Sequence, residues 1–150
     1  MPGFAVQDPE HWIFEGTGLR RGERFGAESQ PPLVGYECDG APLASFDSGS
    51  GIAALSPAAS DCGTPRGYRL LAACALNERW QERPHREEHA SASDIHAATM
   101  GIFTRGGTVF QAGTTDWAQV LASGQDRHVV TITRNAIDGL LQARWKSASR

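Results

Sequence analysis

Short hydrophobic runs separated by glycine, proline and polar residues dominate the chain before residue 113. Several of these runs have the length and composition of β-strands: 11–15, 33–39, 68–76, 100–104 and 108–112. In the first run, alternation predicts that Trp12 and Phe14 lie on one face. The third run, YRLLAACAL, is typical of a strand buried on both faces, with a short helix as the alternative. The last two runs predict a hairpin, because Gly106 and Gly107 form a turn pair between them.

The stretch AGTTDWAQVL joins the last predicted strand to a predicted helix. Gly113 ends the strand, and Thr114 or Thr115 is suited to cap the helix. Asp116 would then lie in the first turn, where a negative charge suits the helix dipole. Capping alone explains these polar residues, and contact with a ligand is the alternative interpretation.

Two amphipathic helices are predicted near the C-terminal end. In the first, apolar residues recur at spacings of three and four, at Trp117, Val120 and Leu121. The second is predicted over residues 128–143, with Asp126 as its start signal. Its apolar positions are Val130, Ala136, Ile137, Leu140 and Leu141.

The order of strand, glycine turn and capped helix favours an α/β sheet with flanking helices. Long loops interrupt this pattern. Residues 41–67 carry turn signals, and residues 77–96 are polar and weakly patterned. Such loops are uncommon in compact domains unless they serve a function or contact another part. The long loops therefore indicate that the chain is a piece of a larger assembly.

Composition narrows the classes of function. A chain of 150 residues predicts a single domain over 1–150, and the net charge of −3 disfavours nucleic acid or an anionic membrane as a partner. No apolar run approaches the roughly 18 residues that cross a bilayer, and no signal peptide is visible. The three cysteines are odd in number and lack a CxxC pair. They indicate reduced thiols in a cytoplasmic protein.

Two acids close the predicted strand 33–39. In α/β sheets, ligands bind beyond the carboxyl ends of the strands, and both Glu37 and the group Thr114–Asp116 fall at such ends. Glu37 is either a structural acid or a functional group delivered to a cleft. Asp39 stands in an Asp-Gly pair, which turn chemistry explains. Cys38 should point away from Glu37 and is expected to be a buried thiol rather than a nucleophile.

The histidines offer a weaker signal. On a helix, the spacing of His85 and His89 would place two imidazoles on one face, as in a zinc site, and His96 follows. However, no glutamate directly follows His85, and loop signals surround the motif. A solvated, charged loop is the favoured interpretation. His11 is open to a structural or a functional role.

Four segments carry a family resemblance. They read HWIFEGTGL, VGYECDG, MGIFTRGGTVFQAGTTDWAQVL and VVTITRNAIDGL. In that order they resemble the C-terminal region of the large (beta) subunit of N,N-dimethylformamidase and related proteins, over about residues 11–141. The resemblance implies a partial glutamine-amidotransferase-like (flavodoxin-like) α/β fold, joined in the full subunit to a sandwich-like portion. It also implies hydrolysis of small amides such as dimethylformamide.

The family uses a mononuclear iron held by two tyrosines and a glutamate. The resemblance implies that these ligands lie upstream of what this chain covers, so no metal ligand is predicted here. Neither Tyr36 nor Tyr68 stands in a motif that matches a metal-binding one. By resemblance, Glu37 would act as general base toward a metal-bound water or orient that water. The residues Thr114, Thr115 and Asp116 would bind substrate, offering hydroxyls and N–H groups to an oxyanion.

Two functional hypotheses follow, with a third beside them. In the first, the chain contributes one wall of an iron-dependent amide hydrolase and is inactive alone, with iron supplied by a missing N-terminal portion or a partner subunit. In the second, it is a non-catalytic scaffold or interaction domain that self-associates through an exposed sheet edge. The third is a truncated gene product without independent function.

Overall fold

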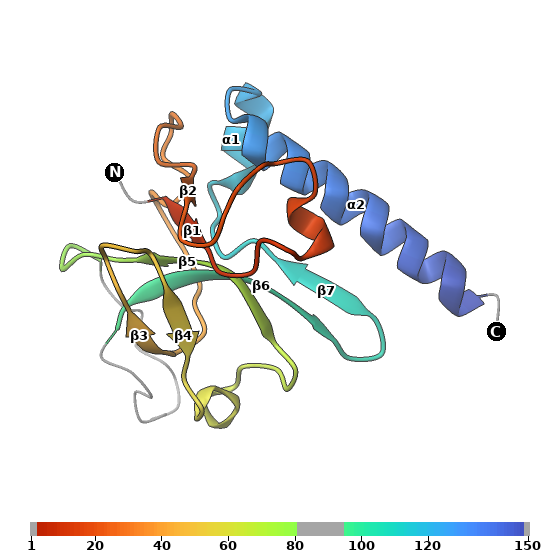
Figure 1. Cartoon of the computed structure of the whole chain (residues 1–150), viewed down its shortest axis with the longest axis horizontal. Helices are drawn as coiled ribbons and strands as arrows, with labels where there is room; N and C mark the ends of the chain where they lie inside the picture. The colour runs from red at the N-terminus through yellow and green to blue at the C-terminus, as the bar shows by residue number, and fades with distance from the viewer. Residues whose placement is uncertain (1–2, 81–94, 149–150) are drawn as a thin grey trace.

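The computed structural model describes residues 3–80 and 95–148, and side chains as far as residue 142 (Figure 1). Within these residues the chain forms strands, two short 3-10 helices and two α-helices. In chain order they are β1 (Phe4–Val6), η1 (Trp12–Phe14), β2 (Arg24–Phe25), β3 (Leu43–Phe46), β4 (Ala53–Leu55), η2 (Ala59–Cys62), β5 (Arg69–Ala75), β6 (Ala97–Thr104), β7 (Thr108–Gln111), α1 (Trp117–Ser123) and α2 (Arg127–Ala148).

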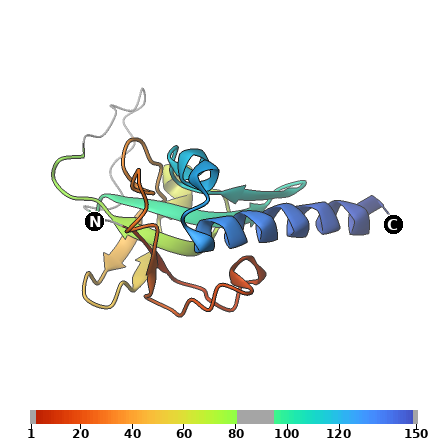
Figure 2. The same ribbon diagram turned by 90° about the horizontal axis from the view of Figure 1, so that it is seen from above.

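The main sheet has five strands in the order β2-β1-β5-β6-β7, and β3 and β4 form a separate hairpin. Every strand pairing in the described residues is antiparallel. The prediction of a flavodoxin-like α/β sheet is therefore wrong, and the fold is mixed α+β. Parallel neighbours require crossover connections, usually helices, whereas both α-helices here follow the last strand. Figures 1 and 2 show α1 beside the N-terminal part of α2.

Two predicted strand regions are confirmed. The apolar run 68–76 forms β5, which pairs with β6 along its length. The predicted hairpin forms from β6 and β7, with Thr104 facing Thr108 at the turn. Gly106 has a φ of 68°, a backbone conformation that glycine adopts without a steric cost. The predicted loop 41–67, in contrast, contains β3 and β4.

The first predicted strand is a 3-10 turn instead. His11 precedes η1, and its Nδ1 accepts a hydrogen bond of 3.3 Å from the N–H of Ile13. Trp12 is 38% exposed while Ile13 and Phe14 are buried, so Trp12 and Phe14 do not share a face as alternation predicted. Asn135 of α2 fixes the turn by donating to the carbonyl oxygens of Ile13 and Glu15.

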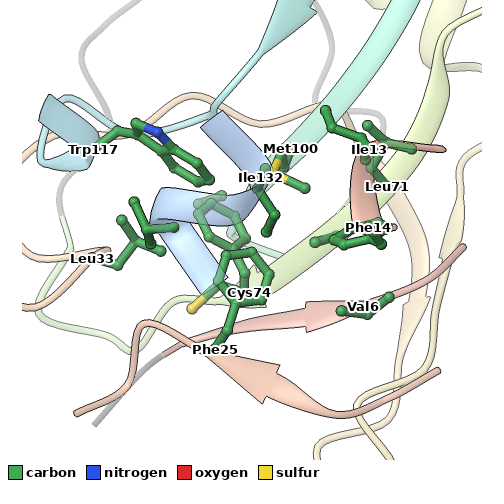
Figure 3. Close-up of a cluster of buried hydrophobic side chains, with 14 of the residues drawn as sticks. Val6, Ile13, Phe14, Phe25, Leu33, Leu71, Cys74, Met100, Trp117 and Ile132 are labelled. Atoms are coloured by element: carbon green, nitrogen blue, oxygen red, sulfur yellow. The ribbon is translucent and has the colours of Figure 1, made fainter. Parts of the chain in front are cut away.

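The core lies where the sheet, η1 and the two α-helices meet (Figure 3). Phe25 of β2 packs edge-on against Trp117 of α1, with ring centroids 6.3 Å apart. The indole N–H of Trp117 donates to the hydroxyl of Thr133 on α2 over 3.0 Å. Trp117 thus connects α1 with α2 through a hydrogen bond and packs α1 against the edge strand β2.

The second predicted helix is confirmed and extends further, but its buried face differs from the predicted one. Asp126 is the start signal as expected, because its Oδ1 accepts from the N–H groups of His128 and Val129. Three side chains enter the core: Val129, Ile132 and Ala136. Ile137 and Leu141 are 54% and 59% exposed. Within the described residues, no helix has the length and hydrophobicity needed to cross a lipid bilayer.

Because of His11, the free energy of unfolding should fall as the pH drops below 7. Burial, helped by the positive charge of Arg69, lowers the pKa of His11 from 6.5, and Asp8 opposes this shift. The unfolded chain therefore binds more protons than the native chain between the lowered pKa and 6.5. The contribution of His11 is fully present above that window and is lost as the pH falls through it.

The variant His11→Asn separates this effect from other titrations. Asparagine does not titrate, and its side-chain oxygen can still accept from the N–H of Ile13. In urea unfolding at pH 7.5 and 5.5, the loss of stability between the two values should be smaller for His11→Asn than for the unaltered chain. The exposed His96→Asn serves as control. Equal pH dependence in all three proteins would refute the role of His11.

Candidate functional site

Residues 33–39, which we call the strap, bend over 33–36 and then run along the turn that precedes α1. The strap is not the predicted strand, since it makes a single β-bridge, between Cys38 and Thr114. The N–H of Asp39 donates to the carbonyl of Gly113 over 3.1 Å. The N–H of Thr115 donates to the carbonyl of Glu37 over 3.0 Å. These bonds bring the two predicted site segments into direct contact.

A buried carboxylate holds the other end of the strap. Asp116 is 3% exposed, and its Oδ2 accepts from the N–H groups of Gly35 and Tyr36 over 2.9 and 2.8 Å. Hydrogen bonds to a charged acceptor are stronger than neutral ones. The strap is not a strand because a side chain, rather than a neighbouring strand, takes these two donors.

The predicted helix α1 is confirmed, but its start differs from the capping prediction. Asp116 precedes the helix and makes no side-chain capping bond. Its own N–H instead donates to the hydroxyl of Thr114 over 3.1 Å. That hydroxyl donates in turn to the carbonyl of Leu33 over 2.8 Å. Thr114 thus links the helix start to the strap.

The predicted site residues lie close together: Glu37, Thr114, Thr115 and Asp116. The sequence predicted that they meet at the carboxyl ends of strands in an α/β sheet. That reason is wrong, because the carboxyl ends of neighbouring antiparallel strands lie at opposite edges of the sheet. The strap bonds bring them together instead. The hydroxyl of Thr115 donates to the carbonyl of Glu37 over 3.1 Å, and Glu37 itself is half-buried. Substrate binding by these residues stays a prediction.

The strap surrounds Cys38 with carboxylates. Burial raises the pKa of the Cys38 thiol to about 11, and the negative charges of Asp39, Asp116 and Glu37 add to the shift. A thiol with so high a pKa is protonated at neutral pH and is a poor nucleophile. This supports the interpretation of Cys38 as a structural thiol. Cys38, Cys62 and Cys74 form no disulfide.

The described residues do not fit the iron site that the family resemblance implies. Tyr68 is 8% exposed, its hydroxyl lies 3.1 Å from that of Thr99, and burial raises its pKa. Burial thus disfavours the phenolate, which is the form that coordinates iron, and the hydroxyl already has Thr99 as its partner. Tyr36, the other tyrosine of the chain, is 80% exposed. No group of three or more metal-ligating His, Cys, Asp or Glu side chains occurs among residues 3–80 and 95–142.

Of the three histidines His85, His89 and His96, only His96 lies in the described residues. His85 and His89 lie outside the described residues. His96 is exposed, and its carbonyl accepts from the N–H of Leu76 beside the end of β5. The structure therefore leaves the predicted charged loop as a prediction.

Sequence reasoning missed two features of this region. One is the exposure of Tyr36, and the other is a hollow of about 340 Å³ around η2. Residues between Leu55 and Tyr68 line this hollow, including Arg66, and no strap residue takes part. The only sequence signal for the exposure of Tyr36 was the glycine directly before it, Gly35. Nothing in the pattern indicated the hollow, because residues 41–67 resembled an ordinary loop.

The fold and the strap define a small mixed α+β domain that presents a fixed, acid-rich loop. Residues 2–130 match the sequence model of the family described as N,N-dimethylformamidase beta subunit-like, C-terminal. The match covers most of the chain, so the chain belongs to this family and the predicted resemblance is confirmed. No match was found among curated proteins.

Removing the Asp116 carboxylate should release the strap. For Asp116→Ala we expect a loss of about 2–3 kcal/mol in the free energy of unfolding, because two hydrogen bonds to a charged acceptor disappear. The loss is limited because Gly35 and Tyr36 are exposed, so water can replace part of the bonding. Urea unfolding measures it, with the exposed Asp61→Ala on η2 as control. Equal stability of the two variants would contradict the anchoring role.

Proposed function

We propose that this chain is an accessory domain of an amide hydrolase of the N,N-dimethylformamidase beta-subunit type. It contributes one wall of the active site and does not turn over amides by itself. Family membership supports the general class. The observation that carries the specific proposal is the strap, whose hydrogen bonds fix the backbone of the exposed Tyr36 and the half-buried Glu37.

The strap has the properties of a docking element. Tyr36 is 80% exposed, although its N–H is bonded to the buried Asp116. Tyrosine is enriched among the residues that contribute most to binding at protein interfaces. A loop that is already ordered loses less conformational entropy on docking than a flexible one. The proposed partner is the metal-bearing portion of the hydrolase, either an N-terminal part of the same subunit or a separate subunit.

Glu37 would supply the chemical contribution to the shared site. Two hydrogen bonds from Thr115 fix its carbonyl, so the carboxylate is delivered from a fixed point on the backbone. A carboxylate so placed can accept a proton from the attacking water or orient that water. Iron would be held by the partner portion, because Tyr36 and Tyr68 do not fit such a site.

A non-catalytic interaction domain is the second candidate, and one observation favours it. The hydroxyls of Thr114 and Thr115 already donate to strap carbonyls. Neither hydroxyl can donate to a substrate without losing its bond to the strap. In this case the strap docks through Tyr36, and Glu37 has no chemical role.

A complementation experiment separates the two candidates. An N,N-dimethylformamidase beta subunit that lacks its own C-terminal domain is titrated with this chain, and formate release from dimethylformamide is measured. If Glu37 acts on the water, the Glu37→Gln variant should bind the truncated subunit as tightly as the unaltered chain does. The kcat of that complex should be lower by at least about 100-fold. The exposed Glu78→Gln should behave as the unaltered chain.

Full activity with Glu37→Gln, together with loss of binding in Tyr36→Ala, would favour the interaction domain. Absence of both binding and restored activity with the unaltered chain would contradict both candidates.

A further inference from the structure

The hollow around η2 has the size and the lining of a small-molecule site. We call it the η2 hollow. Its volume is about 340 Å³, at the lower end of the range of about 300–1,000 Å³ that such sites occupy. The segment between the end of β4 and the start of β5 forms it, and Figure 1 shows η2 at the opposite edge of the molecule from α1 and α2. Four polar side chains line it beside apolar surface: Ser56, Ser60, Thr64 and Arg66.

Arg66 gives the η2 hollow a positive charge. Its side chain is exposed and forms no ion pair with another described residue. No aspartate or glutamate of the described residues lines the η2 hollow, and Asp61 of η2 is not among the lining residues. A guanidinium presents its N–H donors in a planar fork that matches the two oxygens of a carboxylate. This unpaired charge therefore favours an anionic ligand.

Further hydrogen-bond donors line the η2 hollow without a bond to give up. The hydroxyls of Ser60 and Thr64 have no hydrogen-bond partner among the described residues. The backbone N–H groups of Arg66 and Gly67, in the turn before β5, likewise have no acceptor in the part of the chain that the structure describes. In contrast, the two threonine hydroxyls before α1 are already bonded to the strap. The η2 hollow thus offers donors that an anion can use directly.

One wall of the η2 hollow is apolar and held in place. It includes parts of Leu55 and Pro57 and the ring of Tyr68. The hydroxyl of Tyr68 lies 3.1 Å from that of Thr99, and the ring fills the space in which a Cβ on Gly101 would stand. A wall that is already fixed loses little conformational entropy when a ligand binds.

We propose that the η2 hollow binds a small monocarboxylate. The carboxylate oxygens accept from the guanidinium of Arg66 and from the neighbouring hydroxyls, and the hydrocarbon part of the ligand lies against the ring of Tyr68. One guanidinium balances one negative charge. A phosphate dianion would bring a second charge, whereas the other lining groups are neutral. The single arginine and the apolar wall therefore select a carboxylate with a short hydrocarbon chain.

This site goes beyond the proposed hydrolase function and does not rest on it. No strap residue lines the η2 hollow. The binding experiment uses the chain alone, whereas the complementation experiment needs the truncated subunit. Failure of either experiment would therefore leave the other proposal unaffected.

Amide NMR of the full, isotopically labelled chain tests the proposal, with sodium isovalerate as the probe at constant ionic strength. We expect saturable shifts of the Gly67 signal with a Kd of about 0.1–10 mM, the range for a ligand of a few atoms. The signal of Gly35 in the strap should stay in place. Isovaleramide has the same shape without the charge and should bind at least about tenfold more weakly. Equal binding of the amide, or tighter binding of inorganic phosphate, would overturn the proposal.

Two variants test the assigned donors. Arg66→Gln should raise the Kd for isovalerate at least about tenfold, and Thr64→Val, which keeps the shape and removes the hydroxyl, about threefold. Arg105→Gln removes an exposed charge at the turn between β6 and β7 and should change the Kd by less than about twofold. Circular dichroism verifies that each variant is folded. Absence of saturable shifts up to about 100 mM isovalerate would refute the site, as would a Kd unchanged in Arg66→Gln.

Discussion

Replacing Gly113 with alanine should lower the free energy of unfolding by about 2–5 kcal/mol, the sum of two costs. Gly113 has a φ of 74°, a conformation that disfavours any side chain. An added Cβ would also overlap the carbonyl oxygen of Thr99, which belongs to buried β6 backbone and cannot move aside as a flexible side chain would. Urea unfolding followed by circular dichroism measures the loss.

Gly124→Ala is the matched control for this prediction. Gly124 has a φ of 66°, yet nothing lies within 4 Å of the Cβ that alanine would add. It should therefore show the conformational cost alone, about 1 kcal/mol. The difference between the two variants isolates the collision with β6. A difference near zero would mean that the turn carrying Thr114–Asp116 does not depend on close contact with the sheet.

Truncating Ile132 should lower the free energy of unfolding of the whole domain. Its side chain is fully buried at the centre of the cluster in Figure 3. Replacing a buried isoleucine with alanine removes its packing and leaves a cavity, at a cost of about 2–5 kcal/mol. Because α2 also holds η1 through Asn135, the loss should appear in a single cooperative unfolding transition.

Ile137→Ala makes the same chemical change five residues further along the helix. Ile137 is 54% exposed, so little packing is lost, and alanine is the better helix former. The free energy of unfolding of Ile137→Ala should differ from that of the unaltered chain by less than about 0.5 kcal/mol. A cost in Ile137→Ala as large as that in Ile132→Ala would show that the wrong face of α2 has been assigned to the core.

The sequence predicted best those elements whose signals are local. The run 68–76 is apolar throughout and forms β5, and the glycine pair after residue 104 joins a true hairpin. Asp126 and the spacing that follows it gave the start of α2 correctly. In each case a turn, a cap or a continuous apolar run decided the structure without help from distant residues.

The predictions that failed depended on contacts far apart in the sequence. The alternation in residues 11–15 was typical of a strand, but α2 and the imidazole of His11 favour a 3-10 turn there. The prediction of a flavodoxin-like α/β sheet came from the order of strand, glycine turn and capped helix and from the family resemblance, whereas the described strands pair antiparallel and both α-helices follow the last strand. The apolar residues of α2 gave a helix but not its inner face, because exposed positions also carry large aliphatic side chains.

The sequence predicted that Glu37 and the group Thr114–Asp116 lie close together, but it did not predict which contacts bring them together. The sequence placed Glu37 and Thr115 at one crevice of a parallel sheet, whereas the strap bonds bring them together. The anchoring role of Asp116 could not be predicted, since it depends on two N–H groups about 80 residues earlier in the chain.

The central proposal is that this chain is an accessory domain, whose described residues do not fit the iron site of the family and which supplies only part of an active site. Iron content and formate release from dimethylformamide, measured on one purified sample of the chain alone, test it most directly. We predict iron far below one atom per chain and no formate above the uncatalysed rate. Stoichiometric iron together with turnover would contradict the account, because the chain would then contain the whole site.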